Sequence, residues 1–253
     1  YGDDSVGIVA TFLALAMLIP YASVQLMGSG FLFSGLTGGK VPFMVGVLVM
    51  AAFSGFTAVW AGFRSVSWTD AFQAVTMIVT SIVLLFYVFY HFFGGPLDFL
   101  STVSTNTPNL LEINWSFEKF IGLSLPWAFF ALSNPQVSQR MFVSKDISSL
   151  KRMIIYFMIF GFVYTVITTL LGFSIANIIP DIPAGLADEA MPRLLSRVPT
   201  VLGLVVFVGI FAAATSTLGS IVLTLSSLGV MNIATSLRPE ISEKVRLLIG
   251  KAT

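Results

Sequence analysis

The sequence predicts an all-α fold, a polytopic bundle of transmembrane helices, from two observations. Of its 253 residues, 56% are hydrophobic and only 10% are charged, whereas soluble domains carry roughly 25% charged residues. The charged residues also divide the chain into six long uncharged runs, each at least as long as the roughly 20 residues that a spanning helix needs. These runs are continuously apolar, unlike the strands of a membrane barrel, which alternate in polarity.

Six transmembrane helices are expected from these runs, in a single domain that covers residues 1–253. We place them at 5–36, 42–63, 68–93, 118–142, 148–178 and 199–236. The last uncharged run is long enough for two helices. It has no proline after Pro199, and a hairpin there would move the basic residues that follow it to the outer side. We therefore favour one span with a helical extension into the cytoplasm.

The basic residues set the expected orientation in the cell membrane. Four of them flank the turn between the fourth and fifth helices, and four more follow the sixth: Arg140, Lys145, Lys151 and Arg152, then Arg238, Lys244, Arg246 and Lys251. Both groups should be cytoplasmic by the positive-inside rule. Both ends of the chain are then cytoplasmic, and the loops 94–117 and 179–198 are external. These loops contain prolines and short apolar stretches, as short helices that cap a cavity would.

The sequence contains few residues that could catalyse a reaction or bind an organic cofactor. Cysteine is absent and His91 is the only histidine, which argues against thiolate chemistry and transition-metal centres. No paired intramembrane carboxylates appear, and "GLTGGKV" at 35–41 lacks the pattern of a phosphate-binding loop. We expect no enzyme activity and no nucleic-acid partner. The chain has neither an initiator methionine nor the features of a signal peptide, so we expect it to begin inside a longer protein.

Small hydroxyl residues gather in the last helix, in the stretch "FAAATSTLGSIVLTLSS" at 211–227. Spacings of four, four and three place one set on a single helix face: Ser216, Ser220, Thr224 and Ser227. One interpretation is helix packing, because small residues let helices approach closely and hydroxyls can bond back to their own helix. The other is a cation site, in which the hydroxyls of Ser216 and Thr217 and a carbonyl such as that of Ala213 supply hard oxygens.

Three more places put polar side chains in or near the spans. Asn134, Pro135 and Gln136 interrupt the fourth helix, where proline should kink or break it. The interruption is either structural or lines a cavity in which amides and free carbonyls meet a substrate. Tyr21 and Gln25 share a face of the first helix, although tyrosine in a span often serves packing alone. Asp70 opens the third helix, where a carboxylate also complements the helix dipole.

Three stretches resemble the sodium:solute symporter family, which includes the sodium/proline, sodium/pantothenate and sodium/glucose transporters. "AGFRSVSWTDAFQAVTM" resembles the start of the family's fifth core helix, "SNPQVSQRMFVSKD" its sixth, and "AAATSTLGS" the serine and threonine pattern of its eighth. The resemblance implies a fragment of the five-plus-five inverted-repeat fold, with core helices three to eight present and the N-terminal core helices missing. It also implies a secondary active transporter, in which sodium drives the symport of a small organic solute by alternating access.

The resemblance further implies roles for individual residues. Sodium would be bound by the backbone oxygen of Ala213, the hydroxyls of Ser216 and Thr217, and carbonyls of the missing first core helix. Asp70 is placed with this sodium set, near the inner exit of the ion. The solute would be bound by side chains of the first and fourth helices: Tyr21, Gln25, Trp127, Asn134 and Gln136.

The solute and the coupling ion stay open on the sequence alone. Asn134 and Gln136 replace residues of the family's proline branch, Gln25 is closer to the pantothenate pattern, and Asn134 resembles the sugar branch. The candidates are an amino acid such as proline, pantothenate or another carboxylate, or a sugar, with sodium or a proton as the driving ion. Two alternatives remain: a solute-sensing membrane domain of a signalling protein with the same fold, and a structural scaffold in which Ser216 and Thr217 can be replaced by alanine without loss.

Overall fold

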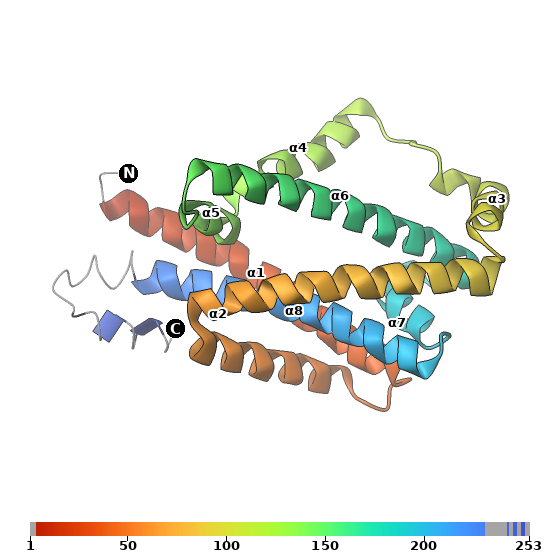
Figure 1. Cartoon of the computed structure of the whole chain (residues 1–253), viewed down its shortest axis with the longest axis horizontal. Coiled ribbons are helices and arrows are strands. Elements are labelled where there is room, and N and C mark those ends of the chain that lie inside the picture. The colour runs from red at the N-terminus through yellow and green to blue at the C-terminus, as the bar shows by residue number, and fades with distance from the viewer. Residues whose placement is uncertain (1–3, 231–241, 243–244, 247–248, 251–253) are drawn as a thin grey trace. The chain divides into compact units, whose positions relative to one another are not determined.

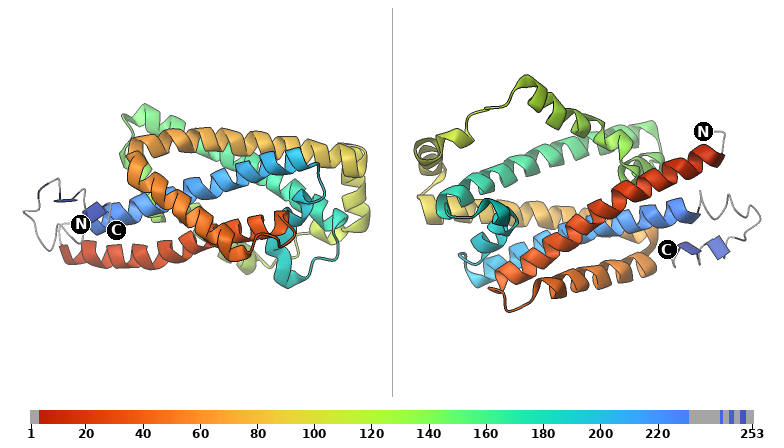
Figure 2. Two further views of the ribbon diagram at one scale, coloured as in Figure 1. Left: turned by 90° about the horizontal axis from the view of Figure 1, so that it is seen from below. Right: turned by 180° about the vertical axis from the view of Figure 1, so that it is seen from behind.

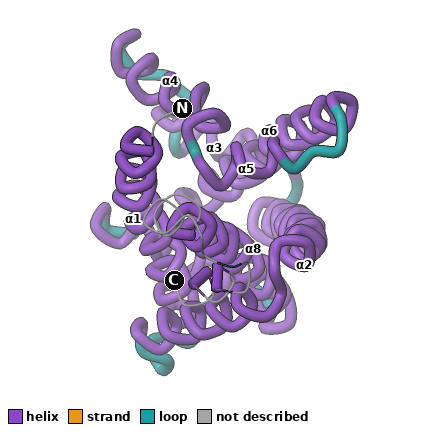
Figure 3. Tube along the Cα trace, turned by 90° about the vertical axis from the view of Figure 1, so that its left-hand side faces the viewer, coloured by secondary structure: helices purple, strands orange, loops and turns teal. Residues whose placement is uncertain are grey.

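The computed structural model describes residues 4–230, 242, 245–246 and 249–250. In this part of the chain every regular element is a helix (Figure 3), which confirms the expected all-α fold. In chain order the elements are α1 (Asp4–Leu36), α2 (Phe43–Val88), η1 (Phe89–Phe93), α3 (Pro96–Asn106), η2 (Pro108–Leu110), α4 (Phe117–Ser133), α5 (Pro135–Phe142), α6 (Ile147–Ile178), η3 (Ala184–Glu189), α7 (Ala190–Leu195) and α8 (Thr200–Leu228) (Figure 1).

The chain forms two compact units, and each is described by itself. The first contains Tyr1–Ser34, Gly39–Ala74 and Phe211–Thr253, and the second contains Gly35–Gly38 and Val75–Ile210. The long helices α2 and α8 each contribute to both units. The first unit therefore holds α1 up to Ser34, α2 up to Ala74, and α8 from Phe211 onward.

Helix α2, continued by η1, covers both helices expected at 42–63 and 68–93, and the two apolar segments Phe43–Ala58 and Ser67–Phe93 correspond to them. Its backbone forms a single helical run from Phe43 to Val88, because this stretch contains no proline and every residue in it can donate an N–H to the helix. Within the first unit, the run changes direction between its dark-orange beginning and the lighter orange part that follows (Figures 1 and 2). The apolar segment long enough to cross a membrane is the later part, Ser67–Phe93, while Phe43–Ala58 is a shorter apolar helix.

Four segments of the described chain are long and apolar enough to cross a membrane, where the sequence led us to expect six. They are Val6–Leu36, Ser67–Phe93, Ile147–Ile178 and Thr200–Leu228. The helix expected at 118–142 is broken at the predicted place: α4 ends at Ser133 after 17 residues, and α5 begins at Pro135. Proline has no N–H to continue the helical hydrogen bonds and clashes with the preceding turn, which explains the interruption. The expected cytoplasmic extension of α8 up to residue 236 lies outside the described residues.

In the first unit, small residues bring α1 and the start of α2 into close contact. The Ser29 hydroxyl donates to the carbonyl of Gly46 at 3.1 Å, and a Cβ on Gly46 would approach the Ser29 carbonyl to 2.8 Å. Such contacts of small residues are the main means by which helices associate in membranes. The ring of Phe211 in α8 packs against Phe33 of α1 and Phe53 of α2, with centroids 6.0 and 5.7 Å apart.

In the second unit, the loop between α2 and α4 is anchored through α3. Phe99 is 1% exposed and packs its ring against Phe89 and Phe93, with centroids 4.6 and 5.2 Å apart. At the other end of α3, the Asn177 side chain of α6 donates through Nδ2 to Thr107 Oγ1 at 3.1 Å. This loop is therefore a packed structure, in contact with both η1 and α6.

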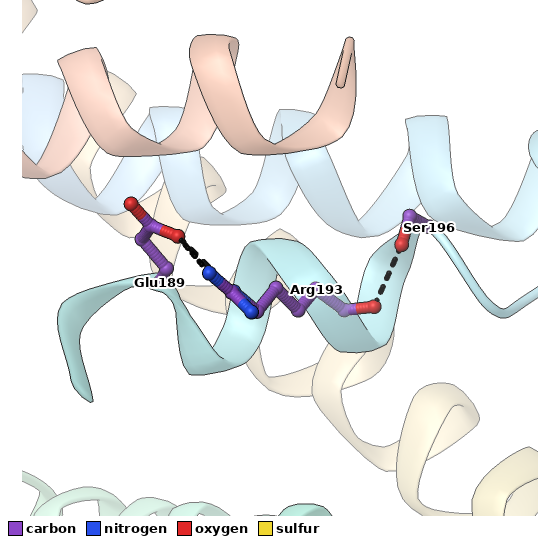
Figure 4. Close-up of polar contacts among 3 residues, drawn as sticks. All are labelled: Glu189, Arg193 and Ser196. Atoms are coloured by element: carbon purple, nitrogen blue, oxygen red, sulfur yellow. Dashed lines mark hydrogen bonds and ion pairs between the residues drawn. The ribbon is translucent and has the colours of Figure 1, made fainter. Parts of the chain in front are cut away.

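The loop between α6 and α8 is ordered by α7. Arg193 donates from Nε and Nη2 to Glu189 Oε2 at 3.0 and 2.7 Å, and the Ser196 hydroxyl caps the carbonyl of Arg193 at 2.8 Å (Figure 4). Pro192 fits closely against Gly35, where a Cβ would lie 2.3 Å from the proline Cβ. Glycine is therefore required at position 35 for α7 to pack there.

Candidate ion and solute site

Five hydroxyl side chains lie along α8 between residues 215 and 224, and four of them bond back to their own helix. Thr217 Oγ1 donates to the carbonyl of Ala213 at 3.1 Å, Ser220 Oγ to that of Ser216 at 2.9 Å, and Thr224 Oγ1 to that of Ser220 at 2.8 Å. Thr215 donates in the same way to the carbonyl of Phe211. This is the ordinary state of serine and threonine in an apolar helix, so these four contacts alone do not indicate a binding site.

Ser216 is the exception, because its hydroxyl donates to an acceptor on another helix, Asp70 Oδ1, at 2.7 Å. Asp70 belongs to the later part of α2, 146 positions earlier in the chain, and both side chains are half-buried. Ser220, one turn further along α8, also donates to the second carboxylate oxygen, Oδ2, at 3.4 Å. The carboxylate of α2 thus faces two hydroxyls on one side of α8.

The cluster of Asp70, Ser216 and Ser220 combines a carboxylate with two hydroxyls inside membrane-length apolar helices. A carboxylate in such a place is costly unless it is hydrogen-bonded or neutralised. The hydroxyls stabilise it as donors, and each keeps oxygen lone pairs that can turn toward a cation. All the ligand atoms are hard oxygens, which suit an alkali or alkaline-earth ion. The described residues contain no cluster of His, Cys, Asp and Glu that would suit a transition metal.

The structure joins only some of the residues that the sequence predicted to bind sodium. Asp70 and Ser216 are in direct contact, whereas Ala213 and Thr217 are linked to each other along α8. Ser220 was not among the predicted ligands, although it contacts the same carboxylate as Ser216. Its spacing of four residues from Ser216 was the signal that could have identified it, because the two must share a helix face.

The interruption between α4 and α5 is stabilised by its own side chain. Asn134 adopts an extended backbone conformation, with φ −83° and ψ 113°, and its Oδ1 accepts a hydrogen bond from the Gln136 N–H at 3.0 Å. Asparagine is a favoured N-cap and proline a favoured first residue of a helix. The amide oxygen of Asn134 is therefore engaged in capping α5, and what it can offer a ligand is its Nδ2 group.

Gln136 differs from Asn134 in that its Oε1 is buried and has no hydrogen-bond partner. Buried amide oxygens are rarely left unpaired, because the unmade hydrogen bond costs about 1–3 kcal/mol. The oxygen lies next to the helix break, where the backbone of α4 has already ended. A group that donates a hydrogen bond would satisfy it there.

The remaining predicted solute residues fall in both units. Tyr21 and Gln25 are half-buried on α1 in the first unit. Trp127 lies on α4 in the second unit, 72% exposed, and its ring is 5.4 Å from that of Phe130. The two sets belong to separately described units, so a shared solute site remains a prediction.

The model of the sodium:solute symporter family matches residues 1–252. This chain belongs to that family. The symporter family is thus established over almost the whole chain, and with its apolar spans it makes this a multi-pass membrane protein. The membership also confirms the resemblance noted in the three sequence stretches.

Individual members of the symporter family share only 22–27% sequence identity with this chain in the following two comparisons. An uncharacterized symporter of Bacillus subtilis (strain 168), YhjB, is 22% identical over 96% of this chain and 50% of its own length. Sodium/myo-inositol cotransporter 2 of Bos taurus is 27% identical over 82% of this chain and 36% of its own length. The chain therefore spans half or less of the length of these relatives.

A solved symporter structure has a similar fold. The substrate-bound, outward-open state of a Na+-coupled sialic acid symporter superposes with a TM-score of 0.78 at 18% identity, covering 97% of this chain and 55% of the other. That structure is described as revealing a novel Na+ site. At this level of identity the similarity establishes the fold, which is that of a sodium-coupled transporter.

Proposed function

We propose that the full protein performs sodium-coupled symport of a small organic solute across the cell membrane, and that Asp70, Ser216, Ser220 and Thr217 belong to its sodium-binding region. Family membership supports the class of activity. The observation that carries the assignment of residues is the hydrogen bond from Ser216 to Asp70. Of the five hydroxyls on this part of α8, Ser216 alone gives up bonding to its own helix.

A sodium ion at this cluster would be bound by oxygens of two helices. The carboxylate of Asp70 comes from α2, and the hydroxyls of Ser216 and Ser220 come from α8. Such an ion binds better when these helices are close than when they are apart, and that difference in affinity is what shifts a conformational equilibrium. Ala213 lies three residues before Ser216 on α8, and Thr217 directly follows Ser216. Their carbonyl and hydroxyl oxygens would complete the set together with other helices of the full protein.

For the solute, the unpartnered oxygen of Gln136 supports a molecule that carries hydrogen-bond donors. Hydroxyl and ammonium groups both meet this requirement, so polyols, sugars and amino acids fit it. Trp127, exposed on α4, offers an aromatic face to the apolar side of the same solute, and Tyr21, Gln25 and Asn134 complete the proposed contacts. Coupling to sodium requires that the two sites change each other's affinity by the same factor.

The test is sodium-dependent uptake and sodium binding by the full-length protein with Ser216→Ala and Thr217→Ala combined. Loss of ligand oxygens should lower sodium affinity roughly 10- to 100-fold, by comparison with the about 1.5–3 kcal/mol of hydrogen bonds to charged groups. Thr215→Ala is the matched control, since it removes a hydroxyl of the same helix that bonds only to its own backbone. An unchanged sodium dependence in the double variant would return the cluster to a packing role.

Asp70→Asn separates the charge from the hydrogen bond. The asparagine Oδ1 can still accept from Ser216, so the contact between α2 and α8 is kept while the negative charge is removed. We expect sodium affinity to fall at least as far as in the serine and threonine variant, with the protein still folded. Wild-type sodium affinity in Asp70→Asn would show that the carboxylate is not part of the ion site.

A further inference from the structure

The turn between α5 and α6 exposes large apolar side chains at a place where the chain changes direction. Phe142, Val143 and Ile147 are 88%, 63% and 73% exposed. Phe142 closes α5 and Ile147 opens α6. A soluble protein seldom presents three such residues together on one short turn, and a contiguous exposed apolar patch indicates a surface that meets another phase or molecule.

Basic side chains surround this apolar patch. Lys145 lies within the turn, and Lys151 and Arg152 lie in the second turn of α6, all three exposed. The carboxylate of Asp146 caps α6, its Oδ1 accepting the Ser149 N–H at 2.7 Å, and it offsets only one of the positive charges in this segment. With Arg140 included, residues 140–152 hold four basic side chains and one carboxylate, a net charge of +3.

An exposed apolar stripe continues from the turn along α6. Ile155, Met158 and Phe162 are 52%, 65% and 73% exposed. They follow Ile147 and Lys151 at spacings that keep all five on one helix face. The helix has 32 residues and is therefore about 48 Å long, which exceeds the hydrocarbon core of about 30 Å. When the stripe lies in the hydrocarbon, the first turns of α6 reach the headgroup layer.

We propose that residues 142–152 form a binding site for anionic phospholipids, in which Lys145 and Lys151 contact the headgroup phosphate while Phe142, Val143 and Ile147 insert among the acyl chains. Lysine side chains suit this arrangement, because their methylene stems lie along apolar surface and their ammonium groups reach the polar layer. Basic clusters beside a transmembrane helix attract anionic lipid at about 1 kcal/mol per residue. The site requires only that the chain is a membrane protein, and it does not depend on the proposed sodium coupling.

Lipid fits this surface better than a protein partner because the apolar stripe and the basic turn are continuous. The stripe has the composition that faces acyl chains, and the charges appear only at its end, where the headgroups begin. In the part of the chain that the structure describes, no carboxylate forms an ion pair with Lys145 or Lys151. A headgroup phosphate supplies the complementary charge at the required depth.

The experiment uses the purified full-length protein in neutral detergent, without sodium or solute, and a fluorescent phosphatidylglycerol as probe. We expect saturable binding that unlabelled phosphatidylglycerol displaces and that weakens with salt. Lys145→Gln with Lys151→Gln should lower the affinity roughly 30-fold, given about 1 kcal/mol per basic residue. Lys40→Gln with Lys119→Gln is the matched control, which removes one lysine charge before α2 and one in the first turn of α4 and should leave the affinity unchanged. Phe142→Ser should also weaken binding, with less effect on its salt dependence.

Three results would overturn the proposal. The first is equal affinity for phosphatidylglycerol in the two double-lysine variants. The second is displacement of the probe by inorganic phosphate or by phosphatidylcholine as effectively as by phosphatidylglycerol, which would mean a free-anion site or a non-selective apolar surface. The third is a cysteine at position 147 that no thiol reagent reaches in lipid-free micelles, which would mean that another part of the protein covers the turn. Each result is independent of whether the protein transports sodium.

Discussion

The role of a hydroxyl side chain in an apolar helix depends on the group to which it donates its hydrogen bond. Thr217 and Thr224 bond to carbonyls of α8, and this local bonding satisfies them without any ligand. Ser216 instead bonds to a carboxylate on another helix. Bonding to the helix's own backbone therefore accounts for Thr217 and Thr224, while the proposal of ion binding rests on the contact that Ser216 makes with another helix.

Gln136 and Asn134 should behave differently, although both are amides at the same break. Gln136→Ala removes the unpartnered Oε1, so we expect weaker solute binding and an unchanged affinity for sodium measured without solute. Asn134→Ala removes the cap of α5, at a cost of about 0.5–2 kcal/mol in helix stability, and should lower the thermal stability of the protein. Asn134→Ser is the control, since serine can also cap. Isothermal titration and thermal unfolding measure the two effects, and a loss of sodium affinity in Gln136→Ala would make that residue structural.

Capping side chains and a proline determine where several helices of this chain begin. Asp146 caps the start of α6 and Asn134 the start of α5, while Ser116 caps α4 by accepting the Lys119 N–H at 3.3 Å. Each cap satisfies an N–H that has no partner inside the helix. These caps set the lengths of the helices that the apolar composition alone would leave undefined.

The cap of α6 should depend on pH. The hydrogen bond from the Ser149 backbone lowers the pKa of Asp146 below its ordinary value of 3.8, because it favours the charged carboxylate. A carboxyl whose pKa is lower in the folded state stabilises the fold above the unfolded-state pKa, and this contribution is lost as the pH falls through the folded-state value. Hydrogen exchange at the first amides of α6 should therefore accelerate, relative to intrinsic rates, as the pH falls below 3.8. Asp146→Asn should remove this dependence, and an identical pH profile in that variant would rule out Asp146 as the titrating group.

Close approach of α2 and α8 in the second unit depends on Gly209. A Cβ at that position would lie 2.3 Å from Thr80 Oγ1, and Thr80 is only 6% exposed. Gly209→Ala should therefore destabilise the protein by about 1–3 kcal/mol, as overpacking generally does. Adding Thr80→Ala should restore most of the loss. Gly172→Ala on α6 is the control, because nothing lies within 4 Å of its added Cβ. Thermal unfolding in detergent measures all three, and additive effects of the two substitutions would contradict a direct clash.

Across the whole chain, the distribution of basic residues predicts which side of the membrane each loop occupies. A single cysteine at Thr105 in α3 should react with an impermeant maleimide added outside intact cells, and one at Ser148 only after the membrane is opened. Both positions are exposed, and the sequence contains no other cysteine. The opposite labelling pattern would reverse the orientation. Labelling of both from one side would contradict the predicted crossing of the membrane by the run 118–142, which contains α4 and α5.

Apolar composition predicted the helical class of the molecule and much of the position of its helices. The helix α6 begins at Ile147 against a predicted start at 148, and α8 begins at Thr200 against 199. The break within the run 118–142 lies where Pro135 predicted it, although a proline signals an interruption without giving its geometry. The contact of Asp70 with Ser216 was outside the reach of periodicity. It depends on the register of two helices joined by 146 residues of chain, and only tertiary packing fixes that register.

The capped break at Asn134 also bears on what the proposed binding of a solute would cost in free energy. Because Asn134 Oδ1 satisfies the first free N–H of α5, the interruption persists without any ligand to hold it open. The local backbone is therefore already ordered when a solute arrives, and little conformational entropy has to be given up at that point. A binding region prepared in this way would favour affinity without a large rearrangement of α5, leaving the free energy of binding available for the movement of whole helices.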